Sequence, residues 1–142
     1  MSHSLFRALP LAAVAFLAFA PLAHAEVVKF SGTFAPEGQS VSDGKGDLSG
    51  SVDTDTNKIT YKITYSGLTG KVVMAHFHGP AAPGQNAPPM LPIPAPYDSG
   101  TLQANDATVK ALLAGTTYVN LHTEKYPGGE IRAQVIPEKG GM

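Results

Sequence analysis

The stretch Lys58-Ile59-Thr60-Tyr61-Lys62-Ile63-Thr64-Tyr65 alternates polar and apolar residues without a break. A period of two is typical of a β-strand with one face in the core and the other in solvent. Residues 53–57 before it are Asp, Thr and Asn, which form tight turns by bonding their own backbone. Glycines at positions 67 and 70 follow it. The stretch therefore predicts a strand between two turns, the basic unit of an antiparallel sheet.

Weaker versions of this pattern predict strands at residues 27–34, 46–52, 71–78, 116–122 and 130–136. The last two flank a Pro-Gly-Gly turn, so we expect them to pair as a hairpin. One short helix is expected over residues 107–114, started by Asn105-Asp106 and stopped by Gly115. Many short strands with Gly/Pro turns favour an antiparallel sandwich or barrel.

Seven prolines lie between residues 79 and 96. Because proline has no N–H to offer a sheet ladder, this segment is predicted as a long, extended surface loop. Loops of this length are often functional, and a tolerated insertion is the alternative.

The first 25 residues have the features of a signal peptide. Arg7 precedes an apolar run over residues 8–22, and Ala23-His24-Ala25 is a small-x-small cleavage signal. The run is shorter than the roughly 20 residues of a membrane span, and no later stretch is apolar enough to span. We expect cleavage after Ala25, one domain over residues 26–137, a flexible tail over residues 138–142, and export to the periplasm or the extracellular space.

Composition excludes several classes of function. The chain has no cysteine, which rules out disulfides, thiolate catalysis and cysteine-ligated zinc or iron–sulfur sites. Its net charge is −1, or −2 once Arg7 is removed with the peptide. Such a balance gives no basic stripe for nucleic acid and no polybasic patch for a membrane surface.

The three histidines beyond the signal peptide carry the best chemical lead. His76 and His78 are two residues apart in a predicted strand and so project from one face, with Ala75 and Phe77 on the other. His122 shares a face with Asn120 in a second strand. If both strands belong to one sheet, three imidazoles converge on its polar outer face or rim.

Imidazole clusters suit copper and zinc. Three histidines leave a fourth position for water or for Glu130, which is predicted to lie on the polar face of the last strand with Arg132. Asn120 and Arg132 would orient the ligands or tune local charge. A hydrogen-bonded structural role for the same side chains is the alternative, in which Glu130 and Arg132 form an exposed ion pair.

Three segments together resemble the CHRD domain, a family named for chordin that also occurs alone in secreted bacterial proteins. They are Ala75-His76-Phe77-His78-Gly79, Ala114-Gly115-Thr116-Thr117-Tyr118-Val119-Asn120-Leu121-His122-Thr123 and Tyr126-Pro127-Gly128-Gly129-Glu130-Ile131-Arg132-Ala133-Gln134. The resemblance covers about residues 27–136. It implies a β-sandwich in an exported protein and does not imply a reaction. Ala133 stands where the family usually has Gly, and the proline-rich insertion is longer than usual.

The His-x-His pair is also similar to that of copper–zinc superoxide dismutases, but the further histidines and the zinc-loop aspartate of that dinuclear site are missing. We therefore predict a mainly β protein, an antiparallel sandwich of immunoglobulin-like or superoxide-dismutase-like Greek-key type. Its predicted function is that of a non-enzymatic, exported binding module for copper or zinc, without catalytic residues. The alternative is a metal-free structural domain or one that recognises a protein or polysaccharide; a dismutase-like enzyme is the third option.

Overall fold

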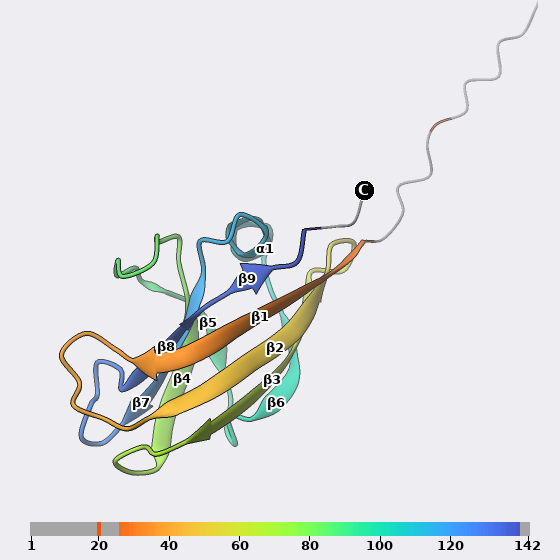
Figure 1. The fold of residues 1–142 in the computed structure, drawn as a ribbon. Helices are drawn as coiled ribbons and strands as arrows, with labels where there is room; N and C mark the ends of the chain where they lie inside the picture. The colour runs from red at the N-terminus through yellow and green to blue at the C-terminus, as the bar shows by residue number, and fades with distance from the viewer. Residues whose placement is uncertain (1–19, 21–25, 140–142) are drawn as a thin grey trace, which may run out of the picture.

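The computed structural model describes residue 20 and residues 26–139 (Figure 1). The predicted signal peptide, except for residue 20, and the last three residues of the predicted tail lie outside the described residues. The elements in chain order are β1 Val27–Pro36, β2 Lys45–Asp53, β3 Lys58–Ser66, β4 Val72–His78, β5 Pro89–Ile93, β6 Ser99–Gln103, α1 Asp106–Leu113, β7 Tyr118–Thr123, β8 Ile131–Gln134 and β9 Ile136–Pro137. In the described part of the chain, no helix has the length and apolarity needed to cross a membrane.

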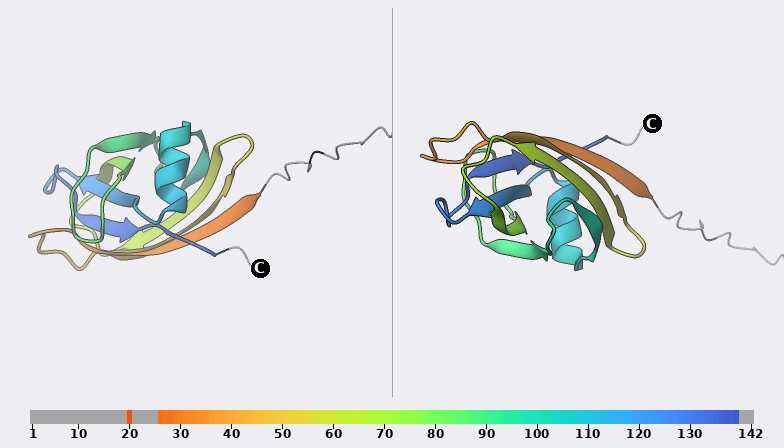
Figure 2. Two further views of the ribbon diagram at one scale, coloured as in Figure 1. Left: turned by 90° about the horizontal axis from the view of Figure 1, so that it is seen from above. Right: turned by 90° about the horizontal axis from the view of Figure 1, so that it is seen from below.

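The strands form one sheet of nine strands, in the order β5-β4-β7-β8-β1-β2-β3-β6, with β9 also paired to β1. Every pairing is antiparallel. Strand β1 joins the two halves, because it pairs with β2 along most of its length and with β8 only through its last two residues. The long strands curve around the shorter ones and α1, which gives the sheet a barrel-like form (Figure 2).

The predicted fold class is confirmed at the level of a mainly β, antiparallel protein with one short helix among the described residues. The sandwich with a Greek-key topology is not confirmed, since the two halves are joined through β1 in one curved sheet. All six predicted strands are present, and β7 pairs with β8 as the predicted hairpin. The helix begins one residue earlier than expected, with Asn105 as its N-cap.

The proline-rich segment differs from the expected continuous loop. Residues 89–93 form β5, which pairs with β4 through Pro89 and Pro92 opposite His78 and His76. Strand β5 is at the edge of the sheet, the position where a strand tolerates proline because one of its sides has no partner. Only residues 79–88 remain as the loop that follows β4.

The core lies inside the curve of the sheet and takes apolar side chains from both halves. Phe77 of β4 contacts Phe30 of β1 and Tyr61 of β3 edge to face, with ring centroids 6.4 Å apart in each pair. Gly50 of β2 makes room for Phe30, because a Cβ at that position would lie 2.3 Å from the phenyl ring. Since Ala75 and Phe77 are fully buried here, His76 and His78 must project from the opposite, outer face of the sheet.

Candidate metal centre

The pairing of β4 with β7 brings the three histidines together. Met74, His76 and His78 of β4 lie opposite His122, Asn120 and Tyr118 of β7. The ring centroid of His76 is 5.4 Å from that of His78 and 5.4 Å from that of His122, and the last two are 6.4 Å apart. One nitrogen from each ring lies within 4.8 Å of the others. The condition that the two strands share a sheet is therefore met, and we call these residues the histidine trio.

Backbone carbonyls determine which ring nitrogens are free. Nδ1 of His78 lies 2.9 Å from the carbonyl oxygen of Ala87, and Nδ1 of His122 lies 2.8 Å from that of Pro127. A carbonyl oxygen can only accept, so each Nδ1 carries a proton, and in the neutral ring Nε2 is the nitrogen that keeps the lone pair. This arrangement, a backbone partner on one nitrogen and a free lone pair on the other, is typical of metal-binding histidines.

Three buried ring nitrogens have no hydrogen-bond partner within the described residues. They are Nε2 of His78, Nε2 of His122 and Nδ1 of His76. Buried polar atoms are rarely left without a partner because each costs desolvation free energy. One from each member of the trio is the pattern expected if all three atoms serve one ligand.

The spacing of the nitrogens fits a tetrahedral ion after a small movement. Zinc binds imidazole nitrogen at about 2.0–2.1 Å, which places two ligand atoms about 3.4 Å apart. The trio spans up to 4.8 Å, so the rings must close by about 1.4 Å at most. His76 is the member whose ring makes no hydrogen bond with the described residues, so its rotation costs least.

The surroundings of His76 and His122 favour the neutral form of both rings. Burial lowers the pKa of His76, and the neighbouring His122 and His78 lower it further. Burial also lowers the pKa of His122, partly offset by the Pro127 carbonyl, which raises it. Both rings are therefore neutral at pH 7 and keep the lone pairs that a metal requires.

A stack of side chains supports His78 from behind. The ring of Tyr118 is parallel to that of His78 within 9°, with centroids 4.8 Å apart. The guanidinium of Arg132 lies 3.4 Å from the centroid of the Tyr118 ring and donates to the carbonyl of Gln85 at 2.7 Å. Arg132 is thus connected to His78 through the Tyr118 ring and to the loop over residues 79–88 through Gln85.

The polar face of β4 lies on the outer side of the sheet, opposite the buried Ala75 and Phe77, but loops that the sequence did not indicate cover much of it. Only 8% of His78, 5% of His122 and 2% of Asn120 are exposed. The loop over residues 79–88 and the turn that holds Pro127 fold onto this face, as their hydrogen bonds to the two histidines show. Alternation predicts which face is polar but not which loops cover it.

The carboxylate of Glu130, predicted as a fourth ligand, points to other partners. It accepts hydrogen bonds from Ser42, from the Thr69 backbone and hydroxyl, and from Thr123, at 2.6 to 2.8 Å. Burial would raise its pKa, but these hydrogen bonds outweigh burial and lower it to about 2. Glu130 precedes the first residue of β8, where the pleat does not yet fix the direction of its side chain. The group of residues able to share an ion comprises the trio without Glu130.

A carboxylate close to the trio comes from a residue that the sequence analysis did not single out. Glu37 follows the end of β1, and it lines a cavity together with His78 and Asn120. Burial raises its pKa, while Asn120, Arg132 and His78 lower it by smaller amounts. The sequence feature that could have pointed to Glu37 is Gly129. A Cβ at position 129 would lie 2.1 Å from Oε2 of Glu37, so the close contact requires a glycine there.

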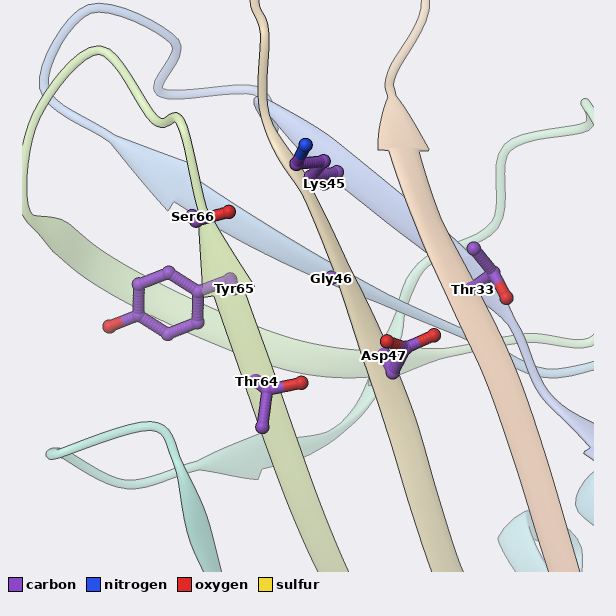
Figure 3. A pocket seen from close by; sticks show the side chains of 7 residues that line it. All are labelled: Thr33, Lys45, Gly46, Asp47, Thr64, Tyr65 and Ser66. Carbon is purple, nitrogen blue, oxygen red and sulfur yellow. The ribbon is translucent and has the colours of Figure 1, made fainter.

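A second, shallow pocket lies across β1, β2 and β3, lined by Thr33, Lys45, Gly46, Asp47, Thr64, Tyr65 and Ser66 (Figure 3). It holds no histidine and a single carboxylate, and its side chains belong to exposed positions of the strands. The trio, by contrast, combines convergence, burial and partnerless nitrogens. The fold and this site together define a small β domain with a candidate three-histidine centre.

The chain belongs to the CHRD domain family, whose model matches residues 19–135. This confirms the family resemblance that the histidine strand and the two later segments predict. No curated protein and no solved structure matches the chain.

Proposed function

We propose that this CHRD domain is an exported, non-enzymatic binding module for a divalent transition metal, copper or zinc. His76, His78 and His122 are the proposed ligands. Two observations carry the proposal: one nitrogen from each ring lies within 4.8 Å of the others, and each ring has a buried nitrogen without a hydrogen-bond partner in the described structure. Asn120 and Arg132 support the site from the neighbouring positions of β7 and β8.

Copper and zinc are favoured by the ligand set. Neutral imidazole is a good ligand for both, whereas magnesium and calcium prefer oxygen. With three protein ligands, a tetrahedral ion keeps one position for another molecule, as in zinc sites that exchange water. At equal ligand sets copper(II) binds more tightly than zinc(II), so we expect copper to displace zinc.

The test is a titration of the protein, produced without a histidine tag, with Cu(II) and Zn(II). We expect one equivalent to bind, and His76→Ala and His122→Ala each to weaken binding at least tenfold. Lys62→Ala, an exposed change on β3, is the control and should bind as the unchanged protein does. Equal, weak affinity in all four proteins would refute the site.

That refuting result would favour the second candidate function, a recognition surface for a protein or polysaccharide. The observation in its favour is that the trio lies under the loop over residues 79–88, whose residues 82–86 are exposed. In that case the histidines would hold loops in place through Ala87 and Pro127.

A further inference from the structure

A cavity of about 340 Å³ adjoins the histidine trio at His78. Its walls come from five separate parts of the chain, and they include Glu37, Asn86, Tyr118, Asn120 and Gly129. Its volume is at the lower end of the range for small-molecule sites. Because His78 belongs to both the trio and the cavity wall, a molecule in the cavity lies beside the proposed metal.

Two oxygen atoms of the residues that line this cavity accept no well-formed hydrogen bond from the residues that the structure describes, although the Asn120 amide lies close to the Glu37 carboxylate. They are Oε2 of Glu37 and Oδ1 of Asn120, and both are buried. Asn120 is 2% exposed and lies directly opposite His76 in the pairing of β4 with β7. Both atoms are acceptors, so a ligand that satisfies them must bring N–H or O–H groups.

Gly129 holds this arrangement together. Its φ of 125° is rarely accessible to other residues, and a Cβ there would lie 2.1 Å from Oε2 of Glu37 and 3.1 Å from Nδ2 of Asn120. The glycine thus lets the turn before β8 lie directly against the two polar side chains. A larger residue would push Glu37 out of place.

The cation beside this cavity, Arg132, already has its own hydrogen-bond partners. The guanidinium of Arg132 donates to the carbonyls of Gln85 and Ala82 and to Gln134, and it covers one face of Tyr118. The acceptors without a well-formed hydrogen bond at this cavity are therefore Oε2 of Glu37 and Oδ1 of Asn120, and the first belongs to a carboxylate. Such a site disfavours anions and favours neutral molecules with donor groups.

We propose that the cavity binds a small neutral ligand with an N–H or O–H group, an amine, alcohol or azole, which completes the metal coordination while donating to Glu37 and Asn120. This inference rests on the proposed metal function, since the lone pair of the ligand goes to the ion that the trio holds. It assigns Glu37 and Asn120 as the residues that select the ligand. The sequence alone gave neither of them this role.

Imidazole and 1-methylimidazole are the probes, because both offer the same kind of lone pair but only imidazole keeps an N–H. Protein loaded with one equivalent of Cu(II) is titrated with each probe and followed by its visible absorption. We expect imidazole to bind about tenfold more tightly, the effect of one hydrogen bond to a charged acceptor. Glu37→Met removes the acceptor at nearly constant side-chain length and should abolish most of this preference.

Controls separate the donor from steric effects. Glu138→Met changes an exposed glutamate and should keep the full preference. Glu37→Gln retains one acceptor oxygen and should keep part of it. Equal affinities for the two probes, or a preference that Glu37→Met leaves unchanged, would overturn the ligand proposal while copper binding stays intact. Loss of Cu(II) binding by the unchanged protein would overturn the metal site, and this proposal with it.

Discussion

At the scale of single residues, two kinds of group matter for the proposed site. They are the ring nitrogens of the histidine trio and the carboxylates of Glu37 and Glu130. The trio keeps its nitrogens free because backbone carbonyls of Ala87 and Pro127 hold the protons on the other side of two rings. Glu130 has the opposite character, because four donors already surround it. A carboxylate in that state is a structural group, and its contribution can be measured separately from metal binding.

Glu130→Gln is expected to destabilise the fold by about 3 kcal/mol. Hydrogen bonds to a charged acceptor contribute about 1.5–3 kcal/mol, and the new amide would direct a donor at other donors. Unfolding in urea measures the loss. Glu138→Gln, at an exposed position, should stay within about 0.5 kcal/mol of the unchanged protein. A loss below about 1 kcal/mol for Glu130→Gln would show that the network is not important to stability.

Lowering the pH should remove the stability that the ionised Glu130 carboxylate contributes. The pKa of Glu130 is lowered from 4.5 to about 2 by its hydrogen bonds. A depressed pKa in the folded state means that stability is fully present above pH 4.5 and is lost as the pH falls toward 2. The difference in unfolding free energy between the protein and Glu130→Gln should therefore shrink across this window. A difference that stays constant from pH 6 to about pH 2.5 would contradict the assignment.

At the scale of elements, the site depends on two strands and the loops that close over them. Strand β4 presents His76 and His78, and β7 presents His122. The loop over residues 79–88 adds the Ala87 carbonyl and is held by Arg132 through Gln85 and Ala82. Loss of this anchor should affect the metal site without touching a ligand.

Arg132→Ala is expected to weaken Zn(II) binding about tenfold or more, the usual cost of losing a supporting residue near metal ligands. The physical reason is that the loop and the Tyr118 ring no longer fix His78. The amides of Gln85 and Ala87 should also exchange with solvent faster, since both bond within this loop region. Lys62→Ala serves as the control. Faster exchange with unchanged Zn(II) affinity would show that the loop does not position His78.

Strand-level features were predictable because alternation reports directly on burial. Ile59, Tyr61 and Ile63 face the core as their spacing indicates, and the helix starts at an Asn105 cap. The alternation of side chains along a strand also predicts that His76 and His78 lie on the same face of β4. The parts that alternation does not encode were missed: β5, which uses prolines at a sheet edge, and the loops that bury the polar face.

Glu130 and Glu37 show the same limit at single positions. Glu130 has the same parity as Arg132, so a continuous strand would place both on the face of the trio, but the strand begins at Ile131. Glu37 reaches the cavity from the turn after β1, whose backbone amide bonds the Glu130 carbonyl 93 positions later in the chain at 2.9 Å. Contacts between turns at such a separation depend on the closed shape of the sheet, which no local pattern specifies.

At the scale of the whole molecule, the proposed metal binding is expected to depend on folding, because the three histidines come from two strands that are paired only in the folded state. An ion at 100 times its dissociation constant stabilises a protein by about 2.7 kcal/mol if it binds the folded form alone. We therefore expect Zn(II) or Cu(II) to raise the melting temperature by several degrees. A chelator should reverse the rise, and His78→Ala should abolish it. A rise of equal size in His78→Ala would place the binding elsewhere.

The most direct measurement is a nitrogen NMR spectrum of protein labelled with ¹⁵N-histidine, recorded at pH 7 before and after one equivalent of Zn(II). Before addition, His78 and His122 should show protonated Nδ1 and lone-pair Nε2. After addition, Nε2 of both residues and one ring nitrogen of His76 should shift together, in proportion to the metal added. Unchanged histidine nitrogens at one full equivalent, or shifts in a single ring, would contradict the three-histidine centre.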